Sequence, residues 1–146
     1  MLDGLFVAPA VTAISEALAS AKATEGALIV VGNAKLAAAL KETRDVITVG
    51  MTARAQKKLG ASLENTVSLA DRSAAAVIGI DVVDDEAWAI TLREWSRVVR
   101  DGGAIVIVDR GPADEAARRA LCAGLTEIEQ RQAGRSVITS GLVTHF

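Results

Sequence analysis

Hydrophobic positions fall into two kinds of segment that follow one another along the chain. Four short runs are apolar almost throughout and rich in β-branched residues, at positions 27–31, 46–49, 74–80 and 104–109. They lack the alternation of polar and apolar residues that a half-exposed strand shows, so they are typical of parallel strands covered on both faces. A shorter run at 65–69 predicts a further strand between the second and third of these runs.

The segments between these runs carry apolar residues at helical spacing. In segment 9–22, apolar residues such as Val11, Ile14 and Leu18 fall on one face, which predicts an amphipathic helix. Asn33 and Thr52 each precede such a segment, and their side chains are expected to accept hydrogen bonds from the first free amides of a helix. Further helices are predicted at 34–41, 53–59, 86–100 and from Gly111-Pro112 to Gly124.

Glycines mark the expected ends of two helices. Gly60 is well placed to stop the helix at 53–59, and Asp101-Gly102-Gly103 is expected to close the helix at 86–100.

The last part of the chain has a different organisation. Two strands are predicted at 126–132 and 136–143, and only Ala133-Gly134-Arg135 joins them, so they must run antiparallel. Strands that alternate with helices and finish in a hairpin predict an α/β fold. We expect a Rossmann-like, mostly parallel sheet with helices on both faces and a C-terminal antiparallel strand pair. The length of 146 residues predicts one domain over 1–146.

Composition and charge exclude several classes of partner. The net charge is −2 and the aromatic share is 3%, with no Tyr, which argues against nucleic acid as a partner. No apolar run approaches the roughly 18 residues that a membrane-spanning helix requires, so no membrane contact is expected.

The single cysteine and the single histidine limit the chemistry further. One Cys, Cys122, forms no internal disulfide, which makes a reducing cytoplasm the expected location. One Cys and one His supply no structural zinc site, and no metal is expected. Cys122 is expected to be a small buried residue, and His145 to be a mobile surface group near the chain end.

Residues 91–109 run from an amphipathic helix through Asp101-Gly102-Gly103 into an apolar strand. This stretch resembles the helix, Gly-Gly turn and fifth strand of the class I S-adenosylmethionine (SAM)-dependent methyltransferase family. Residues 125–143 resemble the terminal strand pair of that family. The resemblance covers nearly the whole chain and implies the same sheet architecture.

The resemblance also implies where a cofactor and a substrate would lie. If a cofactor binds, its implied contacts are Gly32, Asn33, Gly50, Met51 and Asp71. Asp81 follows the strand at 74–80, where the family faces the methyl acceptor, and is the candidate catalytic residue.

The chain departs from the family at the positions that hold SAM. Val30 stands where the first strand of the family ends in an acid, and only Gly32 matches the glycine-rich turn. The second strand ends in Val49-Gly50-Met51, without a carboxylate for the ribose. The two missing acids would each contribute about 1.5–3 kcal/mol, enough to turn micromolar binding into millimolar. The link at 70–73 is also too short for the helix that the family places there.

Each candidate residue has a simpler structural interpretation. Gly32 and Asn33 suit a tight turn and a helix cap, and Asp71 suits a solvated turn. Asp81, with Asp84 and Asp85, suits a cluster that caps the following helix. Trp95 is expected in the core, whereas Trp88 is expected either in the core or at a protein interface.

The sequence therefore leaves more than one functional hypothesis. The first is a non-catalytic interaction or scaffold module without SAM, with a protein partner or a second copy bound at the second-strand or terminal-hairpin side. The alternative is an active SAM-dependent methyltransferase with an atypical pocket, in which backbone groups of Gly32, Gly50 and Met51 replace the missing acids. A third is binding of another nucleotide at the same place.

Overall fold

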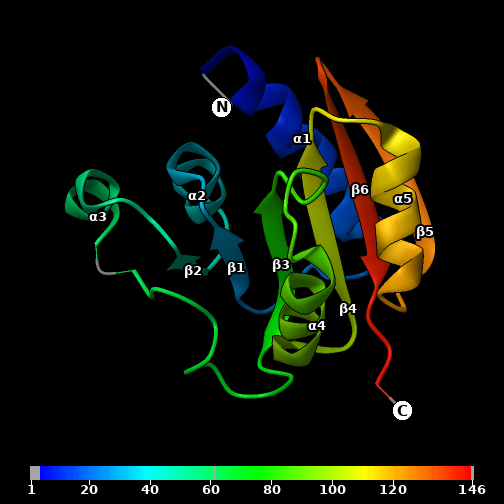
Figure 1. The fold of residues 1–146 in the computed structure, drawn as a ribbon. Coiled ribbons are helices and arrows are strands. Elements are labelled where there is room, and N and C mark those ends of the chain that lie inside the picture. Colours follow the sequence, from blue (N-terminus) through cyan, green and yellow to red (C-terminus); the bar gives the residue numbers. More distant parts are fainter. Residues whose placement is uncertain (1–3, 61, 146) are drawn as a thin grey trace.

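Six strands form one sheet in the order β2-β1-β3-β4-β6-β5 in the computed structural model, which describes residues 4–60 and 62–145 (Figure 1). Strands β1 to β4 run parallel, and β6 is antiparallel to both β4 and β5. The mostly parallel sheet with a C-terminal antiparallel pair is confirmed. The strands are β1 (Leu28–Val31), β2 (Val46–Val49), β3 (Ala74–Ile80), β4 (Val99–Asp109), β5 (Thr126–Ala133) and β6 (Ser136–Leu142).

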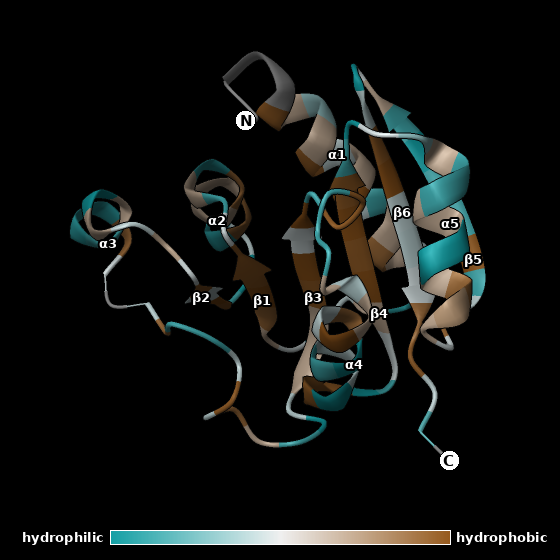
Figure 2. Cartoon of the chain, in the orientation of Figure 1, coloured by the Kyte–Doolittle hydropathy of each residue, from teal (hydrophilic) through white to brown (hydrophobic). Residues whose placement is uncertain are grey.

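Helices cover both faces of this sheet, as predicted. Helices α1 and α2 pack on one face, where Ile14 and Leu36 meet the strand residue Ile78. Helices α4 and α5 pack on the other face, where Trp95 lies 6% exposed against Val77 and its neighbours. The strands between the two layers are the most hydrophobic part of the molecule (Figure 2). The helices are α1 (Gly4–Ser20), α2 (Ala34–Lys41), α3 (Ala53–Leu59), α4 (Trp88–Val98) and α5 (Ala113–Cys122).

Local capping sets the ends of α2 and α3 where the sequence predicted them. The side chain of Asn33 accepts from the Leu36 amide at the start of α2, and Thr52 does the same for Ala55 at the start of α3. Gly60 ends α3 with a φ of 93°, a conformation that glycine adopts without strain. Helix α1 begins at Gly4, earlier than predicted, and contains Pro9.

The strand predicted at 65–69 is wrong. Residues 64–69 form bends and turns, and the nearest ladder contact is an isolated bridge between Val49 and Leu63. Val67 is 74% exposed, so this apolar run does not supply a buried strand.

Helix α4 ends earlier than predicted, and Asp101-Gly102-Gly103 belongs to β4. Strand β4 begins at Val99, which pairs with Ala74 before a register shift. Tertiary contacts explain the difference. A Cβ on Gly103 would lie 2.5 Å from the Ala75 carbonyl oxygen, and the Gly103 carbonyl accepts a hydrogen bond from Val143. Only glycine allows this close approach between strands.

Candidate functional site

The carboxyl ends of β1 and β2 bring Gly32 and Gly50 to the same edge of the sheet. The Gly32 amide donates to the Val49 carbonyl over 2.9 Å, and the two glycines have φ values of 76° and 70°. Nothing lies within 4 Å of the position that a Cβ would take at either residue. The backbone is therefore open to approach at this edge, which is where ligands bind in open α/β sheets.

The side chains beside these glycines face inward. Asn33 is 6% exposed, and its Oδ1 accepts from the Leu36 amide over 2.9 Å. Met51 is 8% exposed and packs into the core beneath α2 and α3. Val30, at the position of the expected acid, is 1% exposed. Val30 and Met51 offer no polar group to a ligand, and the Oδ1 atom of Asn33 is already bonded within α2.

Residues 62 and 63 lie beside β2, the outermost strand at one side of the sheet, and form hydrogen bonds with its backbone groups. The Gly50 amide donates to the Leu63 carbonyl over 2.7 Å, and the Leu63 amide donates to the Thr48 carbonyl over 3.0 Å. The Ser62 hydroxyl donates to the same Thr48 carbonyl. The Gly50 N–H is therefore already bonded within the protein.

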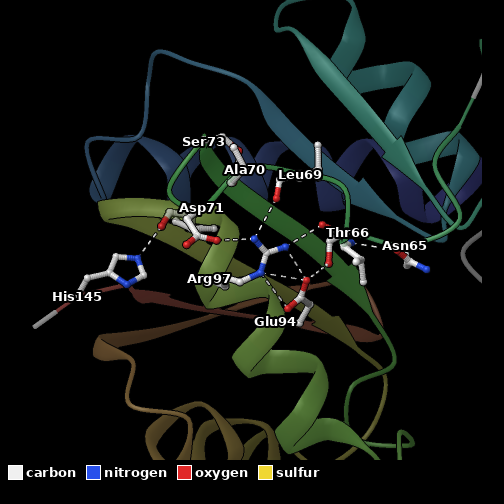
Figure 3. Close-up of polar contacts among 11 residues, drawn as sticks. Asn65, Thr66, Leu69, Ala70, Asp71, Ser73, Glu94, Arg97 and His145 are labelled. Atoms are coloured by element: carbon white, nitrogen blue, oxygen red, sulfur yellow. Dashed lines mark hydrogen bonds and ion pairs between the residues drawn. The ribbon is translucent and has the colours of Figure 1, made fainter.

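Asp71 lies away from this edge. Asp71 precedes β3, whereas Gly32 follows β1. Because β1 and β3 run parallel, Asp71 lies at the amino ends of the strands and Gly32 at their carboxyl ends. The Asp71 carboxylate, 73% exposed, forms an ion pair with Arg97 over 2.6 Å. Figure 3 shows that Arg97 also reaches the carbonyls of Leu69 and Thr66 and the carboxylate of Glu94. Asp71 thus holds a loop at the amino ends of the strands.

Arg97 affects the protonation of its partners because it is a fixed positive charge. Its hydrogen bonds to Glu94 hold the pKa of that carboxyl below its usual range, despite partial burial. The Thr66 hydroxyl donates to the same carboxylate over 3.0 Å. The spacing of Glu94 and Arg97, three residues apart on one helix, was a signal for their ion pair, whereas Thr66 and Asp71 come from a separate segment and gave none.

Asp81 lies at the carboxyl end of β3, with its backbone at a φ of 56° and its side chain exposed. Its amide donates to the Val108 carbonyl, which fixes the turn after the strand. The predicted cap of α4 by Asp84 or Asp85 is wrong, because Ala87 is the N-cap and no side chain caps the helix. The Asp85 carboxylate instead braces the turn by accepting from the Ala87 amide and the Thr91 hydroxyl. No partner base or nucleophile contacts the Asp81 carboxylate in the described residues.

Asp109 is a buried acid that the sequence analysis did not single out. It ends β4 and is 2% exposed. Its Oδ1 accepts from the Val83 amide over 3.1 Å, while Oδ2 has no hydrogen-bond partner among the described residues. Burial raises its pKa, and the nearby carboxylates of Asp81 and Asp84 add to that effect. The sequence did contain a signal for its burial. Asp109 follows Ile105 and Ile107 at every second position of the strand, so its side chain is expected on the same buried face.

Three further residues have surroundings that the sequence left open or mispredicted. Trp88 is half-buried, with Arg118 and Arg119 stacked 5.8 and 5.2 Å from its ring centre. Cys122 is exposed, contrary to expectation, because it lies on the outer face of α5. His145 is held in place, since its Nε2–H donates to the Val99 carbonyl over 2.7 Å and its amide donates to Asp101.

Comparison with known proteins was informative only at the level of structure. No family model matches the sequence, and no curated protein matches it either. Solved structures do match. A proposed SAM-dependent methyltransferase from Methanococcus maripaludis is 13% identical, with a TM-score of 0.73 over 98% of this chain and 89% of that one.

Two other solved structures give the same result. One belongs to the complex of the Haloferax volcanii Trm112 methyltransferase activator with a proposed methyltransferase. It is 14% identical, with a TM-score of 0.70 over 91% of this chain and 89% of that one. The other, a SAM-dependent methyltransferase from Aquifex aeolicus, is 15% identical, with a TM-score of 0.65 and 89% of both chains covered.

The fold is that of the class I SAM-dependent methyltransferases. The resemblance read from residues 91–109 and 125–143 is confirmed for the architecture. The residues that the structure describes contain no group of three or more His, Cys, Asp or Glu side chains that could hold a metal ion. Among residues 4–60 and 62–145, no helix has the length and apolar character needed to cross a membrane.

Proposed function

We propose that this chain is a non-catalytic methyltransferase-fold module that acts through contact with protein and does not use SAM. One observation carries the proposal. At the ends of β1 and β2, the Oδ1 atom of Asn33 and the amides of Gly32 and Gly50 are all bonded within the protein. A SAM molecule would have to compete with these bonds for the groups nearest to it.

The energetic balance at this edge is unfavourable for an adenosyl ligand. Withdrawing Asn33 from its cap would destabilise α2 by about 1 kcal/mol. No carboxylate replaces the acids of the family at Val30, Gly50 or Met51. The ligand would therefore gain no charge-assisted hydrogen bond there in return, each of which is worth about 1.5–3 kcal/mol.

Protein contact as the mode of action has support from a structural neighbour. The Haloferax volcanii structure is a complex of a methyltransferase activator with a proposed methyltransferase, so a protein partner is a known context for a similar fold. We extend this to the present chain as a partner or scaffold subunit.

An active SAM-dependent methyltransferase with an atypical pocket is the second candidate. The positive φ angles and open surroundings of Gly32 and Gly50 favour it, because a ligand can approach the backbone closely there. Neighbours that are SAM-dependent methyltransferases support SAM as the ligand in that case. Backbone carbonyls, including that of Met51, would then contact the ligand in place of carboxylates.

Isothermal titration of SAM and of S-adenosylhomocysteine separates the two candidates. With ligand at about 1 mM, we expect no saturable heat and an unchanged melting temperature. A dissociation constant below about 100 µM for either ligand overturns the non-catalytic proposal.

The Gly32→Asn variant locates any binding that is found. Asn tolerates the left-handed conformation of this residue and places a side chain in the open space beside β1. Loss of binding in this variant assigns the ligand to the edge at β1 and supports the second candidate. A thermal-shift screen of other nucleotides, with the same variant as control, tests the third hypothesis.

A further inference from the structure

An apolar groove with a basic rim lies between α2 and α3. It has a volume of about 370 Å³, and its lining includes the apolar Ala38, Ala55 and Leu59 and the basic Lys35, Arg54 and Lys58. The Lys41 Nζ donates to the Leu59 carbonyl over 3.2 Å, which ties the far ends of the two helices together. The groove is therefore fixed at one end and open along its length.

The cations on the rim of this groove have no acidic partner. Lys35, Arg54 and Lys58 are exposed, and none forms an ion pair with another residue of 4–60 and 62–145. Arg54 and Lys58 are four residues apart on α3, a spacing at which like charges repel. The groove thus combines a small apolar floor with a positive field that the chain itself leaves uncompensated.

An acidic turn lies at the same edge of the sheet. The turn after β3 exposes Asp81, Asp84 and Glu86, and none of them has an ion pair within the described part of the chain. Lys35 and Arg54 lie in the first turns of helices that follow β1 and β2, and these strands are parallel to β3. Figure 1 shows α2, α3 and this turn at the upper end of the sheet.

We infer that the groove between α2 and α3 binds the 81–86 turn of a second copy of this chain. A two-fold axis through this edge places the basic groove of each copy against the acidic turn of the other, so one rotation makes two identical contacts. Such a patch is self-complementary in charge. The inference rests on the proposed function, because the dimer covers the edge at Gly32 and Gly50 where a cofactor would enter.

Two double variants test the inference through the mass of the protein in solution. Lys35→Glu/Arg54→Glu reverses the groove, and its new acidic residues suit the amino-terminal turns of the helices. Asp84→Lys/Glu86→Lys reverses the turn and leaves in place Asp85, whose carboxylate accepts from Ala87 and Thr91. Arg93→Glu/Arg135→Glu is the matched control for the groove variant, because it lowers the net charge by the same amount at exposed sites outside the groove.

Sedimentation equilibrium at about 100 µM protein and low salt is the measurement. We expect the wild type and the control to have twice the chain mass of 15.1 kDa, and each reversed variant to be monomeric. An equimolar mixture of the two reversed variants is expected to regain the doubled mass, since both contacts are then complementary again. About 0.5 M salt is expected to weaken the wild-type dimer at least tenfold.

A monomeric wild type overturns the inference and leaves the groove to a different acidic protein. A dimer that both reversed variants retain, or a mixture that stays monomeric, overturns it as well. The two failures are distinguishable, because the masses can contradict the dimer while SAM and S-adenosylhomocysteine still fail to bind, and only their binding contradicts the proposed function. Circular dichroism of each variant establishes that a change in mass is not a loss of fold.

Discussion

The Arg97 guanidinium lies 2.6 Å from the Asp71 carboxylate and joins the end of α4 to the loop before β3. The same side chain binds the carbonyls of Leu69 and Thr66, so one arginine holds the segment at 64–73 that lacks helix and strand. Figure 3 shows these side-chain contacts, and the Arg97 carbonyl also accepts from the Arg72 amide, so this segment is connected to α4 without a strand ladder.

Arg97→Ala is therefore expected to release this segment and to lower the free energy of unfolding by about 1–3 kcal/mol, because two loop carbonyls lose their charged donor. Hydrogen exchange of residues 64–73, together with urea unfolding, measures both effects. Arg93→Ala, on the exposed face of the same helix, is the control and should change neither. Unaltered exchange in the Arg97→Ala variant would mean that other contacts hold the loop.

Asp109→Asn is expected to stabilise the protein near neutral pH. Burial raises the pKa of Asp109, so ionising this carboxyl in the folded state is unfavourable. The stability gained from its protonated form is complete below the unfolded pKa near 3.9 and is lost as pH rises through the raised pKa. Asn keeps the acceptor for the Val83 amide without the charge.

Urea unfolding between about pH 4 and pH 7 measures this effect, since this range begins at the unfolded pKa of aspartate. The advantage of the Asp109→Asn variant should shrink as the pH falls. The exposed Asp45→Asn is the control, because Asp45 does not contribute to the raised pKa of Asp109. A constant difference between Asp109→Asn and wild type across this range would refute the argument from burial.

Glu115→Gln is expected to have the opposite pH dependence. Hydrogen bonds from Arg118 and Arg119 lower the pKa of Glu115 to about 2. A lowered pKa contributes stability above the unfolded value near 4.3 and loses it as pH falls toward about 2. The variant should thus be less stable than wild type at neutral pH and equal to it in strong acid.

Glu115 also positions Arg119, which donates to the Val82 carbonyl over 2.6 Å in the turn after β3. Faster hydrogen exchange in this turn is the second expected effect of Glu115→Gln. Asp114→Asn, one residue earlier on α5, is the matched control. If Glu115→Gln destabilises the protein equally at every pH, the ion pairs are not the cause.

Gly79→Ala is expected to destabilise the protein by about 1–3 kcal/mol through overpacking. An added Cβ would overlap the outer edge of the Trp95 ring, which lies over Gly79. Urea unfolding of Gly79→Ala, Trp95→Leu and the double variant measures the coupling. The loss in the double variant should be smaller than the sum of the single losses, because Leu leaves room for the methyl group. Additive losses would show that the ring does not limit this site.

The amino-acid sequence alone determined the elements whose causes are local. The apolar runs at Val46–Val49 and Ala74–Ile80 form strands with the predicted bounds. A continuous run of apolar, β-branched residues is a local pattern, so such a strand can be predicted without knowing its partners in the sheet. The caps at Asn33 and Thr52 were likewise predictable, since each bond spans three residues. The glycine edge at Gly32 and Gly50 followed from its position after two such strands.

The tertiary structure decided the features that depend on residues far apart in the sequence. The bonds from Arg97 to Thr66, Leu69 and Asp71 cross 31, 28 and 26 positions, and they connect to α4 a segment that the sequence predicted as a strand. The start of β4 was set by its pairing with β3, and the burial of Asp109 by the turn that covers it. The pattern of hydrophobic residues predicts which side chains are buried. The energy of a buried polar group depends on its hydrogen-bond partner, and that partner is close only in the folded chain.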